Sequence, residues 1–208
     1  EDVEEYVINH SAGVGSALPF LVGTNGNQVY FNGFYNYSFS LVFANQSNGE
    51  IAGTLHGYRD ESVISALHPT SSGQYALAQR KFGQGALLSN AAISEQAIAV
   101  GSDLPTVDFN EIDENARVMI KEFTQAGQEV IMYGTQTKRR QMVFYAYAKE
   151  SGELISINYL GQTNPYLLGD FSVTGDGGLV VAAETYVAGR FSRLQLFKLS
   201  KQEFSEWF

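Results

Sequence analysis

The sequence predicts an all-β protein, a β-propeller of about four repeats, each holding four short strands. Three observations support this fold class. Glycine is frequent and proline is rare, at 21 and 4 residues, and many glycines separate short apolar segments, as is typical of turns between strands. Helical periodicity is weak along the chain. A unit that joins an apolar strand, a threonine with a glycine shortly after it, and a second strand recurs four times.

These units have a nearly constant period. Their glycines are Gly26, Gly73, Gly127 and Gly177, at spacings of 47, 54 and 50 residues. We therefore expect repeats over 14–62, 63–113, 114–163 and 164–208 within a single domain of 1–208. We also expect each glycine to lie in the hairpin turn between the first two strands of its repeat, where positive φ is favoured.

The second half of the unit recurs as well. Asn48-Gly49 and Ser151-Gly152 predict hairpin turns before a fourth strand. The segments Ser94–Val100 and Glu203–Phe208 occupy the same place in the second and fourth units. Counting back from these turns aligns four apolar residues, which we expect to be buried on third strands: Leu41, Leu87, Phe144 and Leu194.

Single segments support strands more than helices. Ser38–Phe43 alternates apolar and polar residues, whereas Gln141–Tyr147 is apolar on both faces, as an inner strand should be. Asn110–Phe123 is the best helical candidate, although Val118–Ile120 within it is typical of a strand. Gly101–Asn115, with its proline and acidic residues, is the expected long loop.

Four strands in about 50 residues is the size of a propeller blade. One blade cannot cover both of its faces, and stacking blades face to face can. A β-sandwich with a similar number of strands is the alternative, but its strands need not repeat at a fixed period.

The last unit resembles a known kind of repeat. Thr174-Gly-Asp-Gly-Gly-Leu-Val-Val-Ala-Ala183, followed by Leu194–Leu199, is similar to the blades of secreted β-propeller repeat proteins of the Bacteroidetes type. Those blades read Asp-Gly-Gly before an apolar run and then have a strand that ends in Lys-Leu. The other three units keep the glycine and lack Asp-Gly-Gly. The resemblance implies a propeller fold and export, as in surface lipoproteins, and implies no activity.

Charge and composition exclude several classes. Thirteen Lys and Arg oppose 22 Asp and Glu, a net charge of -9, which argues against binding to a nucleic-acid backbone. The basic cluster Lys138-Arg139-Arg140 is interpreted as a solvated turn. The absence of cysteine excludes disulfides, thiolate metal sites and cysteine nucleophiles. No apolar run approaches the roughly 20 residues of a transmembrane segment, and we expect any signal segment to lie outside this sequence.

Chemical motifs are missing. The sequence has no phosphate-binding loop, no His-Glu-x-x-His and no Gly-x-Ser-x-Gly. The acidic stretch Asp108–Asn115 lacks the central glycine of a calcium loop. Asp176 is expected to accept backbone amides in its turn, and His10, His56 and His68 are expected to have structural or solvent-facing roles. We therefore predict no catalytic residues, no metal site and no cofactor.

Aromatic residues give the one positive indication of binding. The first unit is rich in them, and Tyr35 and Tyr37 lie in a predicted turn region, where a ring can stack on a sugar or anchor a protein. We therefore expect a non-enzymatic binding or scaffold module of the cell surface or periplasm, in contact with a glycan or a protein. The alternative is a glycan hydrolase or lyase, with carboxylates at the centre of the ring.

The start of the chain resembles the end of a blade. Glu5–His10, followed by Gly13, is similar to Glu153–Asn158, followed by Gly161. Residues 1–13 are therefore a candidate ring-closing strand, with 4–10 paired to the last repeat. The alternative is that the chain is a piece of a larger propeller.

Overall fold

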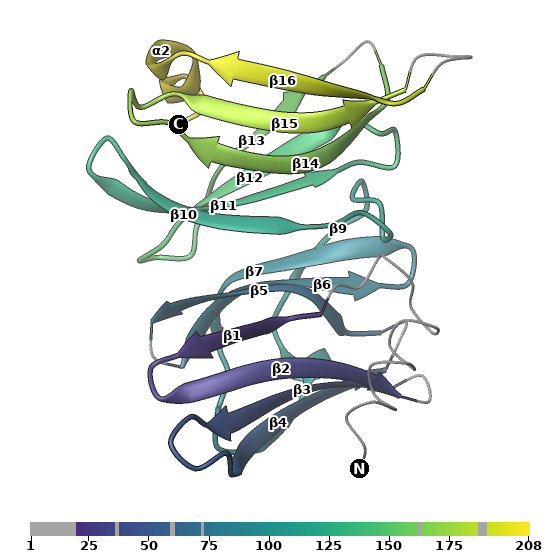
Figure 1. Ribbon diagram of the computed structural model, residues 1–208, viewed down its shortest axis with the longest axis vertical. Helices are drawn as coiled ribbons and strands as arrows, with labels where there is room; N and C mark the ends of the chain where they lie inside the picture. The colour runs from purple at the N-terminus through teal and green to yellow at the C-terminus, as the bar shows by residue number, and fades with distance from the viewer. Residues whose placement is uncertain (1–19, 36–37, 59–60, 72, 162–163, 187–190) are drawn as a thin grey trace. The chain divides into compact units, whose positions relative to one another are not determined.

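A computed structural model describes residues 20–35, 38–58, 61–71, 73–161, 164–186 and 191–208 (Figure 1). The chain divides into two compact units, Glu1–Asn110 and Glu111–Phe208. In the described residues each unit contains two β-sheets. The predicted ring-closing segment 4–10 lies outside the described residues.

In each of the two sheets of the first unit, four strands lie side by side in the order in which they occur along the chain. The strands of the first sheet are β1 (Val22–Asn25), β2 (Gln28–Tyr35), β3 (Ser38–Asn45) and β4 (Ile51–Tyr58). Those of the second are β5 (Val63–Ser71), β6 (Gln74–Lys81), β7 (Gln84–Ala92) and β9 (Val107–Phe109). Within these two sets of four strands, neighbouring strands are antiparallel.

The second unit repeats this plan, but its second sheet has three strands in the described residues instead of four. Its first sheet contains β10 (Met119–Gln125), β11 (Gln128–Gln136), β12 (Met142–Ala148) and β13 (Leu154–Leu160). Its second contains β14 (Tyr166–Val173), β15 (Leu179–Thr185) and β16 (Arg193–Leu199), followed by helix α2 (Lys201–Ser205). All pairings are antiparallel. The predicted all-β class with short meandering sheets is therefore confirmed.

The predicted hairpin glycines are confirmed. Each lies between the first and second strands of its sheet with positive φ: Gly26 at 58°, Gly73 at 69°, Gly127 at 83° and Gly177 at 82°. The turns before the fourth strands β4 and β13 also contain positive-φ glycines, Gly49 and Gly152. A left-handed backbone conformation favours glycine, and each sheet needs one such turn between its first two strands. The glycines therefore recur in the sequence with the period of the sheets.

One hairpin contains a residue that its geometry disfavours. Ala126 and Gly127 join β10 to β11, and both have positive φ, 50° and 83°, as a type I′ turn requires. A non-glycine residue in this region costs about 1–2 kcal/mol, and asparagine is the preferred first residue of such turns. We expect Ala126→Asn to raise the free energy of unfolding by about 0.5–1 kcal/mol in denaturant titrations. Gly127→Ala should lower it, and stabilisation by both changes would contradict this turn type.

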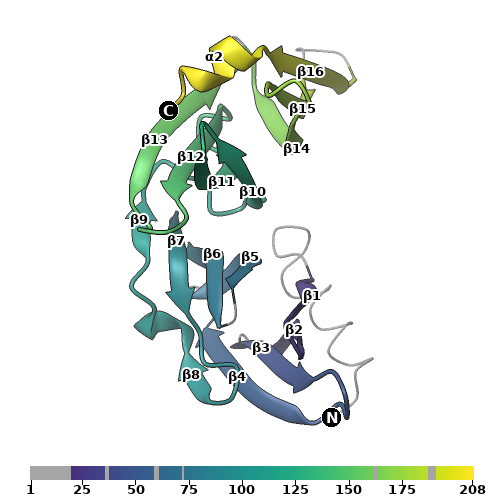
Figure 2. The same cartoon turned by 90° about the vertical axis from the view of Figure 1, so that its left-hand side faces the viewer.

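Two predicted fourth strands are wrong. The segment Ser94–Val100 was expected to complete the second sheet, but its strand β8 (Ile98–Val100) pairs in parallel with β4 of the first sheet (Figure 2). Gly53 of β4 allows this, because a Cβ there would lie 2.7 Å from the backbone oxygen of Glu95. The second sheet is completed instead by β9, which lies within the expected loop Gly101–Asn115.

The segment Glu203–Phe208 does not form a strand either. It belongs to the end of helix α2 and the turn after it. Ser200 caps the helix, its hydroxyl accepting from the Glu203 amide while the Glu203 carboxylate accepts from the Ser200 amide. This reciprocal capping box satisfies backbone donors that would otherwise be free at the helix start. Phe204 is fully buried, which fixes the helix on the unit.

The expected helix over Asn110–Phe123 is also absent. Its second half forms the start of β10, and its first half holds turns and an isolated bridge between Ile112 and Thr137. The apolar run Val118–Ile120 within this segment, which is typical of a strand, indicated the structure better than the helical periodicity did.

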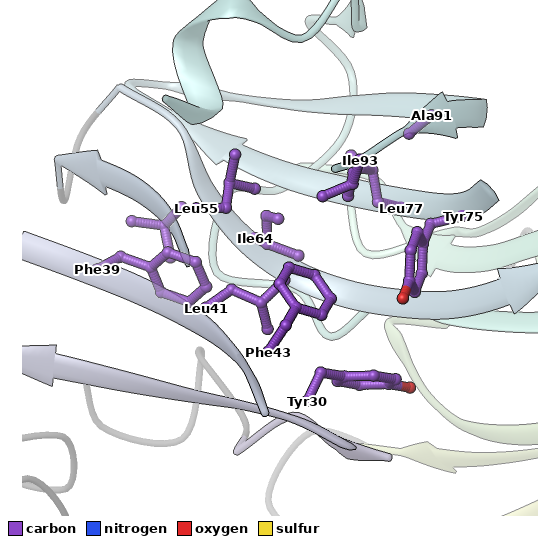
Figure 3. Packing of buried hydrophobic residues seen from close by; sticks show 11 residues of the cluster. Tyr30, Phe39, Leu41, Phe43, Leu55, Ile64, Tyr75, Leu77, Ala91 and Ile93 are labelled. Atoms are coloured by element: carbon purple, nitrogen blue, oxygen red, sulfur yellow. The ribbon is translucent and has the colours of Figure 1, made fainter. Parts of the chain in front are cut away.

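Each unit has an apolar core between its two sheets. In the first, Phe43 contacts Tyr30 and Tyr75 at ring-centroid distances of 6.5 and 6.0 Å, with Leu41 and Ile64 beside them (Figure 3). In the second, Phe144 lies 5.4 Å from Phe171, edge to face. Packing between the two sheets of each unit fixes the strands, and the ends of the strands fix where the connecting loops begin.

The predicted column of buried third-strand residues is correct in three sheets and wrong in the fourth. Leu41, Leu87 and Phe144 are buried, whereas Leu194 on β16 is 75% exposed. Leu194 pairs with Glu184 on the outer face of its sheet, while its neighbour row, Phe197 with Val181, faces the core. Leu194 lies at the same distance from Gly177 as Phe144 does from Gly127, so the alignment itself holds. Leu194 is exposed because, among the described residues of the second unit, no sheet covers the outer face of β14–β16.

Candidate functional site

An open pocket of about 550 Å³ lies at one end of the β10–β13 sheet. Its lining residues come from the loop between β11 and β12, from β13, and from the segment before β10. They are Glu111, Thr137, Lys138, Arg139, Gln141 and Tyr159. These described lining residues all belong to the second unit, and we call this feature the Glu111 pocket.

The β11–β12 loop is held in a fixed conformation. The Thr137 amide donates to the Gln141 carbonyl at 2.8 Å, and the Arg140 amide donates to the Thr137 carbonyl at 2.8 Å. Arg140 has a left-handed backbone, with φ of 60°. Such a conformation persists in a non-glycine residue only where its surroundings impose it.

Glu111 is tied to this loop through its main chain. Its carbonyl accepts from the Lys138 amide at 2.9 Å, and the Asp113 amide donates to the Gln136 carbonyl at 3.1 Å. The intervening Ile112 is buried. The chain before β10 is thereby placed as an extra strand-like segment beside the loop, and the Glu111 side chain can enter the pocket.

Two tyrosine hydroxyls donate to the Glu111 carboxylate. Tyr145 donates to Oε1 at 2.7 Å, and Tyr159 lies 2.9 and 2.8 Å from Oε1 and Oε2. Val143, two residues from Tyr145 on β12, pairs with Tyr159 of β13, so the tyrosines are diagonal neighbours on one face of the sheet. Tyr145 is fully buried, whereas Tyr159 is 43% exposed.

The environment favours the neutral form of both phenols. Burial, reinforced by the hydrogen bond to Glu111, raises the pKa of the Tyr145 hydroxyl well above its usual range. The same causes raise the pKa of Tyr159. Each hydroxyl therefore remains a hydrogen-bond donor to the carboxylate at neutral pH.

The pocket also carries exposed positive charge. Lys138 and Arg139 are exposed, and neither forms an ion pair with any residue that the structure describes. Other lysines do: Lys121 with Asp170 and Lys149 with Glu122. The sequence interpretation of this cluster as an exposed turn agrees with its position, but it missed the pocket that the turn borders.

A smaller hollow of about 320 Å³ lies in the first unit, beside β4, and is lined in part by His56. The Nδ1 atom of His56 lies 3.0 Å from the Ser40 hydroxyl, and Nε2 lies 3.0 Å from the Thr54 hydroxyl. A hydrolytic triad places a carboxylate on the second nitrogen. Here a hydroxyl takes that place, which agrees with the predicted structural role of His56.

The predicted binding residues are not tested by these observations. Tyr35 ends β2, but its side chain lies outside what the structure describes, as does Tyr37. Their role in ligand contact stays a prediction.

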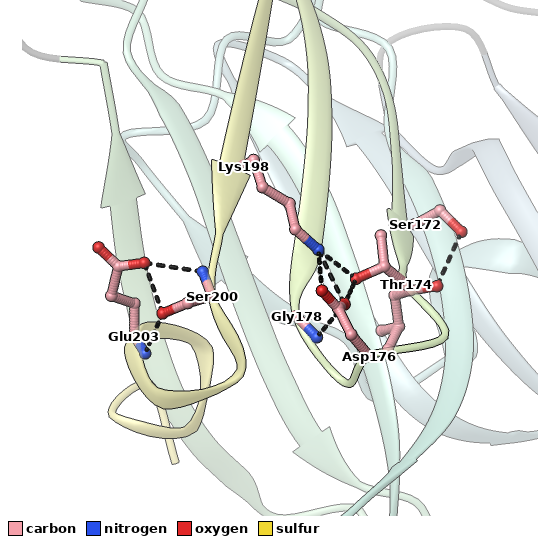
Figure 4. Close-up of polar contacts among 8 residues, drawn as sticks. Ser172, Thr174, Asp176, Gly178, Lys198, Ser200 and Glu203 are labelled. Atoms are coloured by element: carbon pink, nitrogen blue, oxygen red, sulfur yellow. Dashed lines mark hydrogen bonds and ion pairs between the residues drawn. The ribbon is translucent and has the colours of Figure 1, made fainter.

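Asp176 has the turn role that its sequence predicts (Figure 4). Its carboxylate accepts from the Gly178 amide at 3.2 Å, from Lys198 Nζ at 2.8 Å and from the Thr174 hydroxyl. The Lys198 ammonium first, and then the other two donors, hold the pKa of Asp176 well below its usual range. These contacts join the two halves of the motif that resembles secreted propeller blades.

In the described ranges, no three His, Asp or Glu side chains gather as a metal site would need. No helix in these ranges is long and apolar enough to span a membrane.

Comparison with known proteins adds evidence on the fold. No protein-family model matches the sequence, and no curated protein matches it. Solved structures do. The NanB sialidase from Streptococcus pneumoniae superposes with a TM-score of 0.56 at 13% identity, over 89% of this chain and 30% of the sialidase. The Dos1 propeller gives a TM-score of 0.52 at 11% identity, over 85% of this chain and 42% of Dos1.

A third solved structure that matches this chain is also a β-propeller. The β-propeller domain of the trilobed protease from Pyrococcus furiosus gives a TM-score of 0.50 at 10% identity, over 87% of this chain and 54% of that one. The chain has the β-propeller fold. At these identities the matches establish the fold alone, and the chain spans about a third to a half of the lengths of these proteins.

Proposed function

We propose that this protein is a non-enzymatic binding module, exported to the periplasm or cell surface, that contacts a glycan through the Glu111 pocket. The observation that carries the proposal is the set of groups meeting there: a carboxylate, an amide, two cations and the half-exposed ring of Tyr159. Sugar hydroxyls need donors and acceptors of this kind, and an aromatic face covers a sugar ring. Export is supported by the resemblance of Thr174–Ala183 to secreted propeller blades.

A glycan hydrolase is the second candidate, because one similar structure is a sialidase. Most glycosidases need two carboxyl groups across the scissile bond, and sialidases use a tyrosine nucleophile. Glu111 is the single carboxylate among the described lining residues of the pocket. Tyr159 is hydrogen-bonded to it, but among the described lining residues no second acid could protonate a leaving group. These features favour binding over hydrolysis.

Removal of the Tyr159 ring tests the proposal. On a glycan array, we expect Tyr159→Ala to weaken binding of the preferred glycan about 10- to 100-fold, which corresponds to roughly 1.4–2.8 kcal/mol. Tyr159→Phe should have a smaller effect, since it keeps the stacking face. Phe82→Ala removes an aromatic side chain that is 84% exposed on another turn, and it should leave binding unchanged.

Two outcomes would overturn this function. The first is that no glycan on the array binds the wild-type protein. The second is that Tyr159→Ala binds as well as the wild type. Release of free sugar from a bound glycan would instead support the hydrolase, and cell fractionation of the full-length protein tests export.

A further inference from the structure

We infer that the Glu111 pocket selects sugars that carry an anionic group, a carboxylate or a sulfate, and that Lys138 and Arg139 bind this group. The inference rests on the proposed function and deepens it. Its starting point is a local contrast in charge, because two cations that form no ion pair with a described residue border a pocket in a chain of net charge -9.

Within the part of the chain that the structure describes, no carboxylate pairs with these cations. Glu111 lines the same pocket, yet neither Lys138 nor Arg139 forms an ion pair with it or with another described residue. The Glu111 carboxylate is engaged by two tyrosine hydroxyls instead. The positive charge of the loop is therefore available to a ligand.

The loop also presents these cations from a defined backbone. The Lys138 amide is bound to the Glu111 carbonyl, and the left-handed Arg140 closes the turn on Thr137. A fixed turn lowers the entropy that is lost on binding. The planar guanidinium of Arg139 matches a carboxylate or sulfate through two parallel hydrogen bonds, and Lys138 adds a point charge.

The remaining lining groups suit the neutral part of a sugar. Glu111 has acceptor capacity beyond its tyrosine partners, and the Gln141 side chain supplies an amide. The exposed part of Tyr159 offers a ring face. The two cations beside the Glu111 carboxylate thus distinguish this pocket from one that fits only a neutral sugar.

Calorimetric titration of the intact protein tests the inference with matched sugars: lactose, sialyllactose and sulfated lactose. We expect at least one anionic sugar to bind tenfold or more tightly than lactose at low salt, and the preference to shrink as salt screens the charges. Tighter binding of sialyllactose would identify the preferred group as a carboxylate, and tighter binding of sulfated lactose would identify it as a sulfate. The double variant Lys138→Gln/Arg139→Gln should lose this preference, so that it binds the anionic sugars no more tightly than lactose.

Lys121→Gln is the control, because Lys121 belongs to the same unit and is already paired with Asp170; it should keep the preference. Equal affinity for all three sugars would overturn the inference and leave the proposed function standing. A double variant that still prefers the anionic sugar would also overturn it. If none of the sugars binds and the glycan array is also empty, the proposed function itself fails.

Discussion

Phe144→Ala should lower the free energy of unfolding by about 3–5 kcal/mol, the cost of truncating a fully buried aromatic residue. Phe144 is completely buried on β12 and contacts Phe171 and Trp207, with ring-centroid distances of 5.4 and 5.2 Å. The cavity would open at the centre of the second unit, where β14, β15 and α2 also contribute. Denaturant titration with a fluorescence readout at Trp207 measures the change.

Leu194→Ala is the matched control. The sequence pattern aligns Leu194 with Phe144, but its side chain is 75% exposed. Its truncation should change stability by less than about 0.5 kcal/mol, as at other exposed positions. A loss below about 1 kcal/mol for Phe144→Ala would contradict the core position described above, given the range for buried aromatics.

Gly178→Ala should have the next largest effect. A Cβ at this position would lie 2.3 Å from the Leu199 carbonyl oxygen, a backbone atom that cannot move aside without displacing β16. We expect a loss of about 1–3 kcal/mol or more, as for other overpacked sites. The thermal midpoint of the second unit reports this change.

Gly175→Ala in the same turn provides the comparison. Gly175 has no heavy atom within 4 Å of its ideal Cβ position and is absent from the positive-φ glycines. This substitution should be nearly neutral. If the two alanine variants proved equally stable, the close approach of Gly178 to β16 would be wrong.

The period of the fold was predictable because its cause is local. A hairpin that needs positive φ selects glycine, so Gly26, Gly73, Gly127 and Gly177 mark the four sheets in the sequence itself. Alternation within strands likewise depends on which face is buried, and Phe39, Leu41 and Phe43 of β3 follow it.

The outer strands were harder to predict because their partners are distant in the sequence. Nothing near Ile98 indicates that β8 pairs with β4 rather than with β7. The helix at the end of the chain did have a local sign, the Ser-x-x-Glu pattern of Ser200 and Glu203, which is the capping box. The place of Glu203–Phe208 in its repeat, which corresponds to a fourth strand in other repeats, favoured a strand instead.

The candidate site could not be predicted from spacing. Glu111 meets Tyr145 and Tyr159, which lie 34 and 48 residues away in the sequence. Only the pairing of β12 with β13, together with the bridge at Ile112, brings them into one pocket. The basic loop was visible in the sequence, but its acidic and aromatic neighbours were not.

The strand β8 has a consequence for how the first unit opens. In a stack of independent repeats, each blade can unfold while its neighbour stays native. Here the chain that leaves β7 crosses to β4, and the side chain of Gln79 on β6 donates to the Gly101 carbonyl at 2.8 Å just after β8. Melting the second sheet therefore removes a strand from the first. In native-state hydrogen exchange, the amides of β4 and β6 should form one foldon, with a common free energy of opening.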